Sequence, residues 1–167
     1  MQLATRKGYE YVDVALREVG VKEVSGPEAE ARILEYHSTC SLHAKSDEVA
    51  WCSAFVNWVM AQVGGARTKS AAALSWLKWG EAIKTPCFGC LVILDYGGGH
   101  GHVGIVVGAS AGNLVVLGGN QSNQVCLRRM PKKENMSFRK PSGALRFELP
   151  EIPANEVASL TSIAETR

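Results

Sequence analysis

The chain has 167 residues, of which 46% are hydrophobic and 20% charged, and its formal net charge is +2. These values are ordinary for a folded domain, and they argue against a disordered chain or a strongly basic nucleic-acid-binding protein. We expect one domain over residues 1–149 and a short tail over residues 150–167.

The first half of the chain has the apolar spacing of helices. One helix is predicted over residues 9–19 and ends at Gly20, and a second covers residues 31–36. A third begins near the polar residues 46–47, carries Cys52 in its opening turn and ends at Gly64-Gly65. A short helix is predicted over residues 70–79.

The second half has the pattern of strands separated by turns rich in glycine and asparagine. The predicted strands cover residues 90–95, 102–107, 113–117, 125–130 and 144–149. Helices followed by a meander of strands predict an α+β fold, with the N-terminal helices on an antiparallel sheet of about five strands.

The number of cysteines and the length of the apolar runs indicate the compartment in which the protein is made. The five cysteines are an odd, scattered set, which does not fit a disulfide framework and indicates synthesis in a reducing cytoplasm. No secretory signal peptide is predicted at the N-terminus, and no run is long enough for a membrane-spanning helix. A late cluster of basic residues between Arg128 and Lys140 is interpreted as a solvated turn.

Cys52 and His102 are the candidates for chemistry. A cysteine at a helix N-terminus lies in the positive field of the helix, which favours a thiolate. His102 begins a predicted strand between Gly101 and Gly104, and these two glycines are expected to leave room for an extended substrate. A histidine that takes and returns the thiol proton completes a cysteine hydrolase. The alternative is that both side chains only pack.

Asn120 is the candidate for a third group that orients the imidazole. It closes the strand that follows the histidine strand, where a returning hairpin can bring its side chain to the ring. Ordinary turn chemistry explains an asparagine at this place equally well.

A competing interpretation uses Cys87, Cys90, His100 and His102. Two cysteines and two histidines can bind zinc, and a CxxC pair can be redox-active. The histidines are only two residues apart and the gap from the cysteines is short, so the spacing is a weak match. We therefore expect no metal and no cofactor.

Six segments in this order resemble the NlpC/P60 and CHAP superfamily of papain-like cysteine peptidoglycan hydrolases. They are ALREVGVKE at 15–23, ILEY at 33–36, DEVAWCSAFVNW at 47–58, SWLKWG at 75–80, GHVG at 101–104 and LGGNQSN at 117–123. The resemblance implies a papain-like fold with Cys52 as nucleophile, His102 as general base and acid, and Asn120 as the orienting residue. The segment 88–90 departs from the family's usual Pro-Gly-Asp turn, which leaves Cys87 and Cys90 unexplained.

The resemblance also implies a substrate and a place of action. The target is an amide of bacterial peptidoglycan, cleaved by a muramoyl-L-alanine amidase or a stem-peptide endopeptidase that is a phage lysis enzyme or a secreted antibacterial effector. Such an enzyme acts in the periplasm or outside the cell after delivery or lysis, and an effector has a cognate immunity protein that covers its site. A module that binds the wall without catalysis is the alternative. The expected substrate-binding residues are Asp47, Glu48, Trp51, Trp76, Trp79, Gly101 and Gln121. For Asp47 and Glu48, a role at the positive end of the helix is the favoured alternative.

Overall fold

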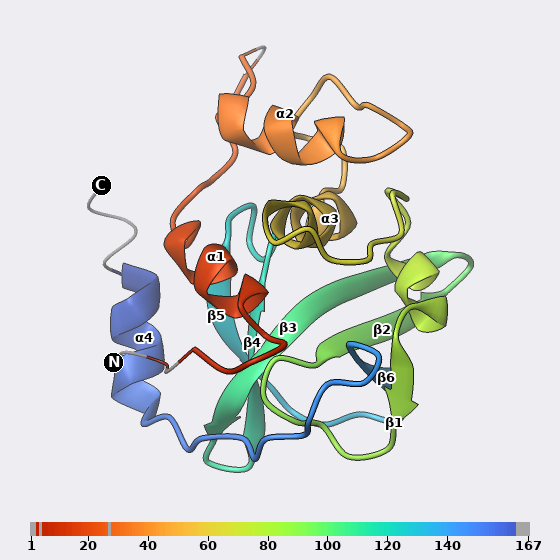
Figure 1. The fold of residues 1–167 in the computed structure, drawn as a ribbon. Helices are drawn as coiled ribbons and strands as arrows, with labels where there is room; N and C mark the ends of the chain where they lie inside the picture. The colour runs from red at the N-terminus through yellow and green to blue at the C-terminus, as the bar shows by residue number, and fades with distance from the viewer. Residues whose placement is uncertain (1–2, 4, 27, 163–167) are drawn as a thin grey trace.

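The computed structural model describes residue 3, residues 5–26 and residues 28–162 (Figure 1). The helices of the first half are α1 (Tyr11–Arg17), α2 (Ala31–Ser38), α3 (Cys52–Gln62) and the 3₁₀ helix η1 (Ala73–Lys78). The strands that follow are β1 (Glu81–Ile83), β2 (Leu91–Gly97), β3 (His100–Ser110), β4 (Asn113–Gly118), β5 (Cys126–Met130) and β6 (Met136–Lys140), and α4 (Ala154–Ser162) comes last. Within the described residues, no helix has both the length and the apolar character needed to cross a bilayer.

The strands form one antiparallel sheet in the order β1-β6-β2-β3-β4-β5. The α+β prediction is therefore confirmed, with six strands in place of about five. Strand β3 lies inside the sheet between β2 and β4, and its register places His102 opposite Leu94. The histidine strand is thus held by hydrogen bonds on both sides, which makes it a rigid support for a side chain that must be positioned accurately.

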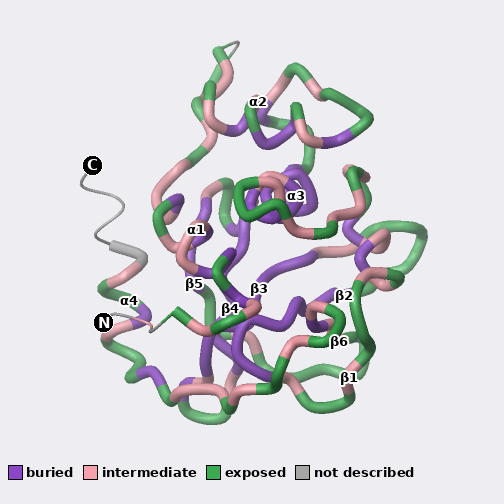
Figure 2. Tube along the Cα trace, in the orientation of Figure 1, coloured by how far each residue is buried: buried purple, intermediate pink, exposed green. Residues whose placement is uncertain are grey.

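Helix α3 is the hub of the helical layer. It packs against β3 and is also in contact with α1 and α2. Its side chains are buried along most of its length, and Figure 2 shows α3 and the central strands as the most deeply buried parts of the fold. The Tyr36 ring on α2 lies 5.3 Å from that of Phe55 and 5.8 Å from that of Trp51, centroid to centroid. These contacts fix the N-terminal end of α3 over the sheet.

The central strands bury side chains on both faces. Alternate residues such as Ile93 and Ile105 join the core beneath the helices, whereas Val92, Val106 and Val116 join a second, smaller apolar cluster. A strand buried on both faces has a continuous apolar run and not an alternating one, as the sequence of β2 shows.

Three predicted elements differ from the structure. Residues 144–149 form no strand, whereas two observed strands, β1 and β6, were not predicted; β6 lies between β1 and β2. The segment 144–149 makes isolated contacts in place of a ladder, as where the N–H of Phe88 donates to the carbonyl of Phe147 over 2.9 Å. Helix α3 begins at Cys52 and not near residue 47, and the predicted helix over 70–79 is the 3₁₀ helix η1.

The described part of the predicted tail packs on the sheet. The N–H of Ala109 on β3 donates to the carbonyl of Pro150, and the N–H of Ile152 donates back to the carbonyl of Ala109. Ile152 is fully buried and Val157 on α4 nearly so. Residues 163–167 of that tail lie outside the described residues.

Candidate active site

Cys52 is the first residue of α3, and its side chain is 6% exposed. Trp51 precedes it without capping the helix by a side-chain hydrogen bond, so the first N–H groups of α3 are available to the cysteine. Burial raises the pKa of the Cys52 thiol, and hydrogen bonds from the backbone N–H groups of Val103 and Ser53 partly offset that rise. The resting side chain is therefore a thiol, bonded to the backbone of the residue next to His102.

The His102 imidazole is held by Gln121. Its Nε2 lies 3.1 Å from Gln121 Oε1, and Gln121 is 2% exposed. The Gln121 side-chain N–H groups donate to the carbonyls of Cys126, over 2.7 Å, and Val116, over 3.3 Å. Because both carbonyls only accept, they fix the amide with its oxygen toward the imidazole. His102 Nε2 must then carry the hydrogen, and Nδ1 keeps a free lone pair.

The protonation state of His102 suits a base. Burial lowers the pKa of its imidazole, the hydrogen bond to Gln121 acts in the opposite direction, and the positive charge of Arg128 lowers the pKa further. At neutral pH the ring is therefore uncharged and able to accept a proton. The pair at rest is a neutral thiol and a neutral imidazole.

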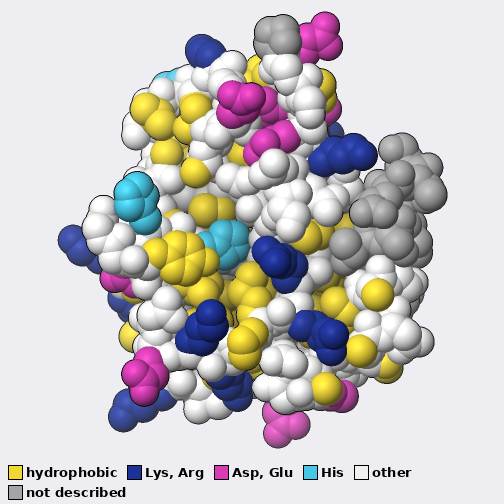
Figure 3. Space-filling model, turned by 180° about the vertical axis from the view of Figure 1, so that it is seen from behind, with side chains coloured by type: hydrophobic (Ala, Val, Ile, Leu, Met, Phe, Trp, Pro, Cys, Tyr) yellow, Lys and Arg dark blue, Asp and Glu magenta, His cyan; other side chains and the backbone are white. Residues whose placement is uncertain are grey.

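Both side chains open into one cavity of about 260 Å³. Its walls are formed by Ala50, Cys52, Tyr96, Gly101, His102, Asn120, Gln121, Arg128 and Met130. On the rear face of the molecule a histidine side chain is visible in a hollow, with apolar and basic side chains beside it (Figure 3). The cavity thus presents a thiol, a base and a cation to any ligand that enters it.

The residue that contacts the imidazole differs from the one predicted. Asn120 lines the cavity, but the hydrogen bond to His102 comes from its neighbour Gln121. Asn120 has a left-handed backbone, with φ +54°, two residues after the end of β4. That conformation turns the chain and directs the next side chain inward to the histidine.

Glycine at position 118 makes room for this hydrogen bond. A Cβ there would lie 2.8 Å from Gln121 Oε1 and 3.3 Å from His102 Nε2. The glycines predicted to clear space for substrate have another role. A Cβ on Gly101 would meet the Leu94 carbonyl at 2.5 Å, and one on Gly104 would meet Val116 Cγ1 at 2.5 Å. Protein atoms fill that space, and Gly101 reaches the cavity wall without a side chain.

Two of the predicted substrate-binding tryptophans are core residues. Trp51 and Trp76 are fully buried, and neither lines the cavity. The Trp51 indole N–H donates to Glu23 over 2.8 Å, and that of Trp76 donates to Ser53 Oγ over 2.8 Å. Each of these hydrogen bonds gives the indole N–H an acceptor inside the fold. The bond from Trp76 also holds the side chain of Ser53, the residue next to Cys52.

The acidic pair before the nucleophile does not reach the cavity either. Asp47 is 1% exposed, and its carboxylate accepts the backbone N–H groups of Val24 and Glu30. Glu48 is exposed and lies outside the cavity wall. Asp47 therefore ties the loop before α2 to the loop before α3, which is a structural role.

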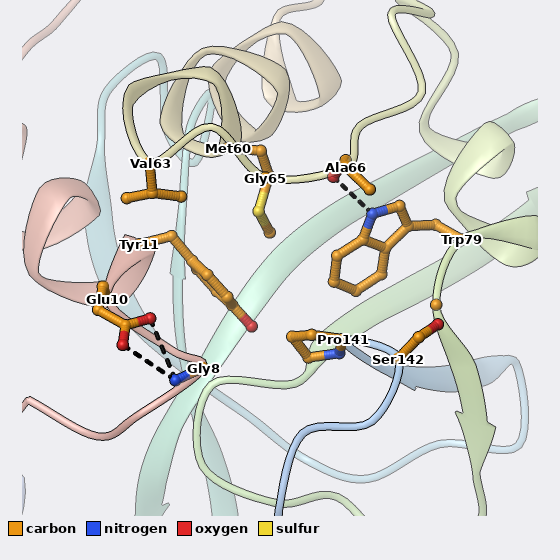
Figure 4. A pocket seen from close by; sticks show the side chains of 11 residues that line it. Gly8, Glu10, Tyr11, Met60, Val63, Gly65, Ala66, Trp79, Pro141 and Ser142 are labelled. Carbon is orange, nitrogen blue, oxygen red and sulfur yellow. Dashed lines mark hydrogen bonds between the residues drawn. The ribbon is translucent and has the colours of Figure 1, made fainter.

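Trp79 lines a different cavity, of about 320 Å³, at the far end of α3 (Figure 4). Its indole N–H donates to the carbonyl of Ala66 over 2.7 Å, and its ring faces Tyr11 and Met60 across the opening. Val63, beside this cavity, is eleven residues from Cys52, or about 16 Å along a helix axis. Trp79 thus lies outside the site of Cys52 and His102.

The four residues of the competing metal interpretation do not converge. The Cys90 carbonyl bonds to the N–H of Val106, four positions along β3 from His102, or about 13 Å. His100 is exposed at the start of β3. Among the described residues no group of three or more His, Cys, Asp or Glu is placed to bind a metal ion. The proposed zinc arrangement is wrong for this fold.

Four wall residues were not predicted from the sequence: Ala50, Tyr96, Arg128 and Met130. Arg128 is the charged residue among them. It belongs to the basic cluster interpreted as a solvated turn, but it lies on β5 and reaches the cavity. Its position two residues after the buried Cys126 on a predicted strand was the available signal, since alternate residues share a face.

Comparison with known families agrees with this geometry. Residues 44–120 match the family model of the CHAP domain, and the match includes both Cys52 and His102. It ends at Asn120, one residue before Gln121. A comparison with curated proteins finds no match. The segment that carries the thiol and the imidazole is therefore similar to the CHAP domain, in agreement with the resemblance seen in the sequence.

Proposed function

We propose that the protein hydrolyses an amide bond of bacterial peptidoglycan, with Cys52 as nucleophile and His102 as general base and acid. The observation that carries this proposal is the hydrogen bond between His102 Nε2 and Gln121 Oε1. Because two carbonyls hold the Gln121 amide in place, Nδ1 of the imidazole is left as the basic nitrogen. Gln121 is a positioning residue in this scheme.

The first half-reaction forms a thioester. His102 Nδ1 accepts the Cys52 proton as the sulfur attacks the carbonyl carbon of the amide. The negative charge that develops on the carbonyl oxygen is stabilised by N–H groups at the start of α3, including those of Cys52 and Ser53. The imidazolium then donates its proton to the departing amine, and the acyl group stays on the sulfur.

The second half-reaction releases the acid. With the amine gone, Nδ1 accepts a proton from a water molecule that attacks the thioester carbonyl. The tetrahedral intermediate collapses, the carboxylic acid leaves, and the Cys52 sulfur recovers its proton from the imidazolium. The net reaction adds water across the amide and returns the neutral thiol and imidazole that the fold stabilises.

Arg128 indicates which part of peptidoglycan the cavity binds. Its guanidinium is the fixed positive charge among the side chains that line the cavity, and carboxylates are its preferred partners. Stem peptides of peptidoglycan carry carboxylates, whereas the sugar backbone offers mainly hydroxyl and amide groups. We therefore assign the cavity to a stretch of stem peptide with a carboxylate next to the bond that is cleaved.

The proposal covers a muramoyl-L-alanine amidase and a stem-peptide endopeptidase. In either case the enzyme acts on the wall outside the cytoplasm, as a phage lysis enzyme or as a secreted antibacterial effector. An effector needs a cognate immunity protein, and an acidic partner surface over Arg128 is the complementary one. A binding module without catalysis is disfavoured, since a thiol and a correctly tautomerised imidazole share one cavity.

The test is mass spectrometry of the products released from purified peptidoglycan. The wild-type protein is compared with Cys52→Ala and with a matched control, Cys40→Ala, which removes a buried thiol outside the cavity. Stem peptides freed from sugar indicate an amidase, and cleaved peptides still attached to muramic acid indicate an endopeptidase. Products should persist in the control and vanish with Cys52→Ala. No product from folded wild-type protein would overturn the proposal.

A further inference from the structure

We propose that Cys87 and Cys90 form a second reactive site, a dithiol that closes reversibly to a disulfide by exchange with a small disulfide such as oxidised glutathione. The site is separate from Cys52, and the proposed wall hydrolysis does not use it.

The backbone brings the two cysteines together. Residues 87–90 form a β-turn in which the N–H of Cys90 donates to the carbonyl of Cys87 over 3.1 Å. The ends of a β-turn lie within about 7 Å, Cα to Cα, and disulfides span about 4.4–6.8 Å. The N–H of Cys87 also donates to Cys90 Sγ over 3.4 Å, so the second sulfur already points back at the first residue.

The surrounding residues hold this turn in place. Gly89 has φ +78°, and a Cβ there would lie 2.3 Å from the Tyr9 ring, so glycine is required on both counts. The Tyr11 hydroxyl donates to the carbonyl of Gly89. On the other side, the N–H of Gly89 donates to the carbonyl of Val106 on β3 over 2.7 Å. The turn that carries the two cysteines is thus held by hydrogen bonds on both sides.

The side chains around Cys87 favour a reactive thiolate. The Tyr9 hydroxyl lies 3.8 Å from Cys87 Sγ, and its hydrogen is donated to the carbonyl of Leu145 over 2.9 Å. The pKa of the Cys87 thiol is lowered, first by the hydrogen bond from the Cys90 thiol and also by the positive charge of Arg146, while burial acts in the opposite direction. The pKa of Cys90 is raised, since its thiol donates to Cys87 and is buried. The pair therefore divides into an attacking and a resolving thiol.

The attacking thiol lies beside a cavity. Cys87 is 2% exposed and forms part of the wall of a cavity of about 460 Å³, which Lys132, Arg146 and Glu148 also line. The Arg146 guanidinium is held there by a 2.9 Å hydrogen bond to the carbonyl of Thr85. Two cations at the cavity suit an anionic disulfide such as oxidised glutathione, which carries carboxylates.

The exchange balances in two steps. The Cys87 thiolate attacks one sulfur of glutathione disulfide, which forms a mixed disulfide and releases one glutathione thiolate. Cys90 gives its proton to that thiolate and attacks the Cys87 sulfur, which releases the second glutathione. The second glutathione leaves as a thiolate and takes up a proton from solvent, which replaces the one that Cys87 lost when it ionised. Counted from the dithiol, the protein loses two electrons and two protons, and one glutathione disulfide becomes two glutathione thiols.

The test counts thiols in the native wild-type protein after incubation with excess oxidised glutathione. The protein is then denatured, alkylated and digested, and its peptides are mapped by mass spectrometry. We expect the five free cysteines to fall to three, because one disulfide consumes two of them. The map should join Cys87 to Cys90, and dithiothreitol should restore all five thiols.

Two variants define the order of attack. Cys90→Ser lacks the resolving thiol, so the reaction should stop with one glutathione attached at Cys87. Cys126→Ser is the matched control: it removes a buried thiol from another strand, and the 87–90 disulfide should still form. Five unreacted thiols in the wild type, or a disulfide that joins other cysteines, would overturn the inference. These outcomes do not depend on wall cleavage, so they leave the proposed function untouched.

Discussion

The surroundings of Cys52 and of Cys87 differ in the property most often used to recognise a nucleophile. Each cysteine lies at the wall of a cavity, but burial raises the pKa of Cys52 while neighbouring donors lower the pKa of Cys87. Only Cys52 shares its cavity with an imidazole whose tautomer leaves a basic nitrogen free. Thiol acidity therefore does not identify the hydrolytic cysteine in this fold. The presence of a positioned base does.

Removal of the nucleophile or the base should have the largest effect. We expect Cys52→Ala and His102→Ala each to lower kcat/KM for muropeptides by roughly 10³-fold or more, because covalent attack then has no sulfur or no proton acceptor. The double variant should be hardly worse than either single one, as expected for groups that act as a unit. Independent, multiplicative losses would contradict the shared role.

Variants of Gln121 and Asn120 test which of these two residues orients the imidazole. Gln121→Ala should lower kcat/KM by about 10²-fold, since the imidazole loses the bond that fixes its tautomer, while Asn120→Ala should cost less than about tenfold. In Gln121→Ala the carbonyls of Val116 and Cys126 also lose their hydrogen-bond donor, so the free energy of unfolding should fall by about 1–3 kcal/mol. Circular dichroism at the assay temperature must show both variants folded. A larger loss for Asn120→Ala would return the role to that residue.

Gly118→Ala tests the same hydrogen bond without removing either partner. The added Cβ would lie 2.8 Å from Gln121 Oε1, which must move away from His102. Gly118 is not among the positive-φ residues, so alanine brings no strain of that kind. We expect a loss of kcat smaller than that of Gln121→Ala and a nearly unchanged melting temperature. Full activity would show that the imidazole does not need this contact.

Arg128→Gln should shift the pH profile and weaken substrate binding. The positive charge of Arg128 lowers the pKa of His102, so its removal favours the imidazolium and moves the acid limb of kcat/KM to higher pH. In the wild type, burial places that limb below pH 6.5. Loss of one charged hydrogen bond to a substrate carboxylate should raise KM about tenfold. An unchanged KM with amidated and free stem peptides alike would exclude carboxylate recognition.

The double variant Cys87→Ser with Cys90→Ser should have the smallest effect on the rate of peptidoglycan hydrolysis. Hydrolysis under reducing conditions should stay within about twofold of the wild type, because sites this far apart usually act independently. A strong loss of hydrolysis in a folded protein would mean that the turn before β2 controls the histidine strand.

The placement of Cys52 at a helix start and of His102 near the head of a strand could be predicted because their signals are local. A cysteine at a helix start and a histidine at the head of an apolar strand are each encoded within a few residues. Gln121 was expected to bind substrate, but its hydrogen bond to His102 could not be predicted, since β4 ends at Gly118 and left-handed residues at 120 and 122 break the alternation that assigns side chains to faces. A choice between two adjacent polar residues then depends on the turn alone.

The misassigned elements have a similar cause. The apolar alternation of residues 144–149 reflects an extended segment packed on the domain by isolated hydrogen bonds, and alternation alone does not reveal whether a ladder forms. Strand β6 is largely polar yet inserts between β1 and β2, so its pairing comes from partners distant in sequence. The burial of Trp51 and Trp76 likewise depends on the distant acceptors Glu23 and Ser53.

The neutral thiol at rest has a consequence for the design of inhibitors and labels. Alkylating reagents select thiolates, so the neutral Cys52 thiol is a poor target for a small electrophile chosen for reactivity alone. A selective covalent inhibitor of the hydrolytic centre needs a weak electrophile attached to a carboxylate-bearing scaffold. Its affinity for Arg128 would hold it beside the sulfur, and His102 would generate the thiolate only once the ligand is bound.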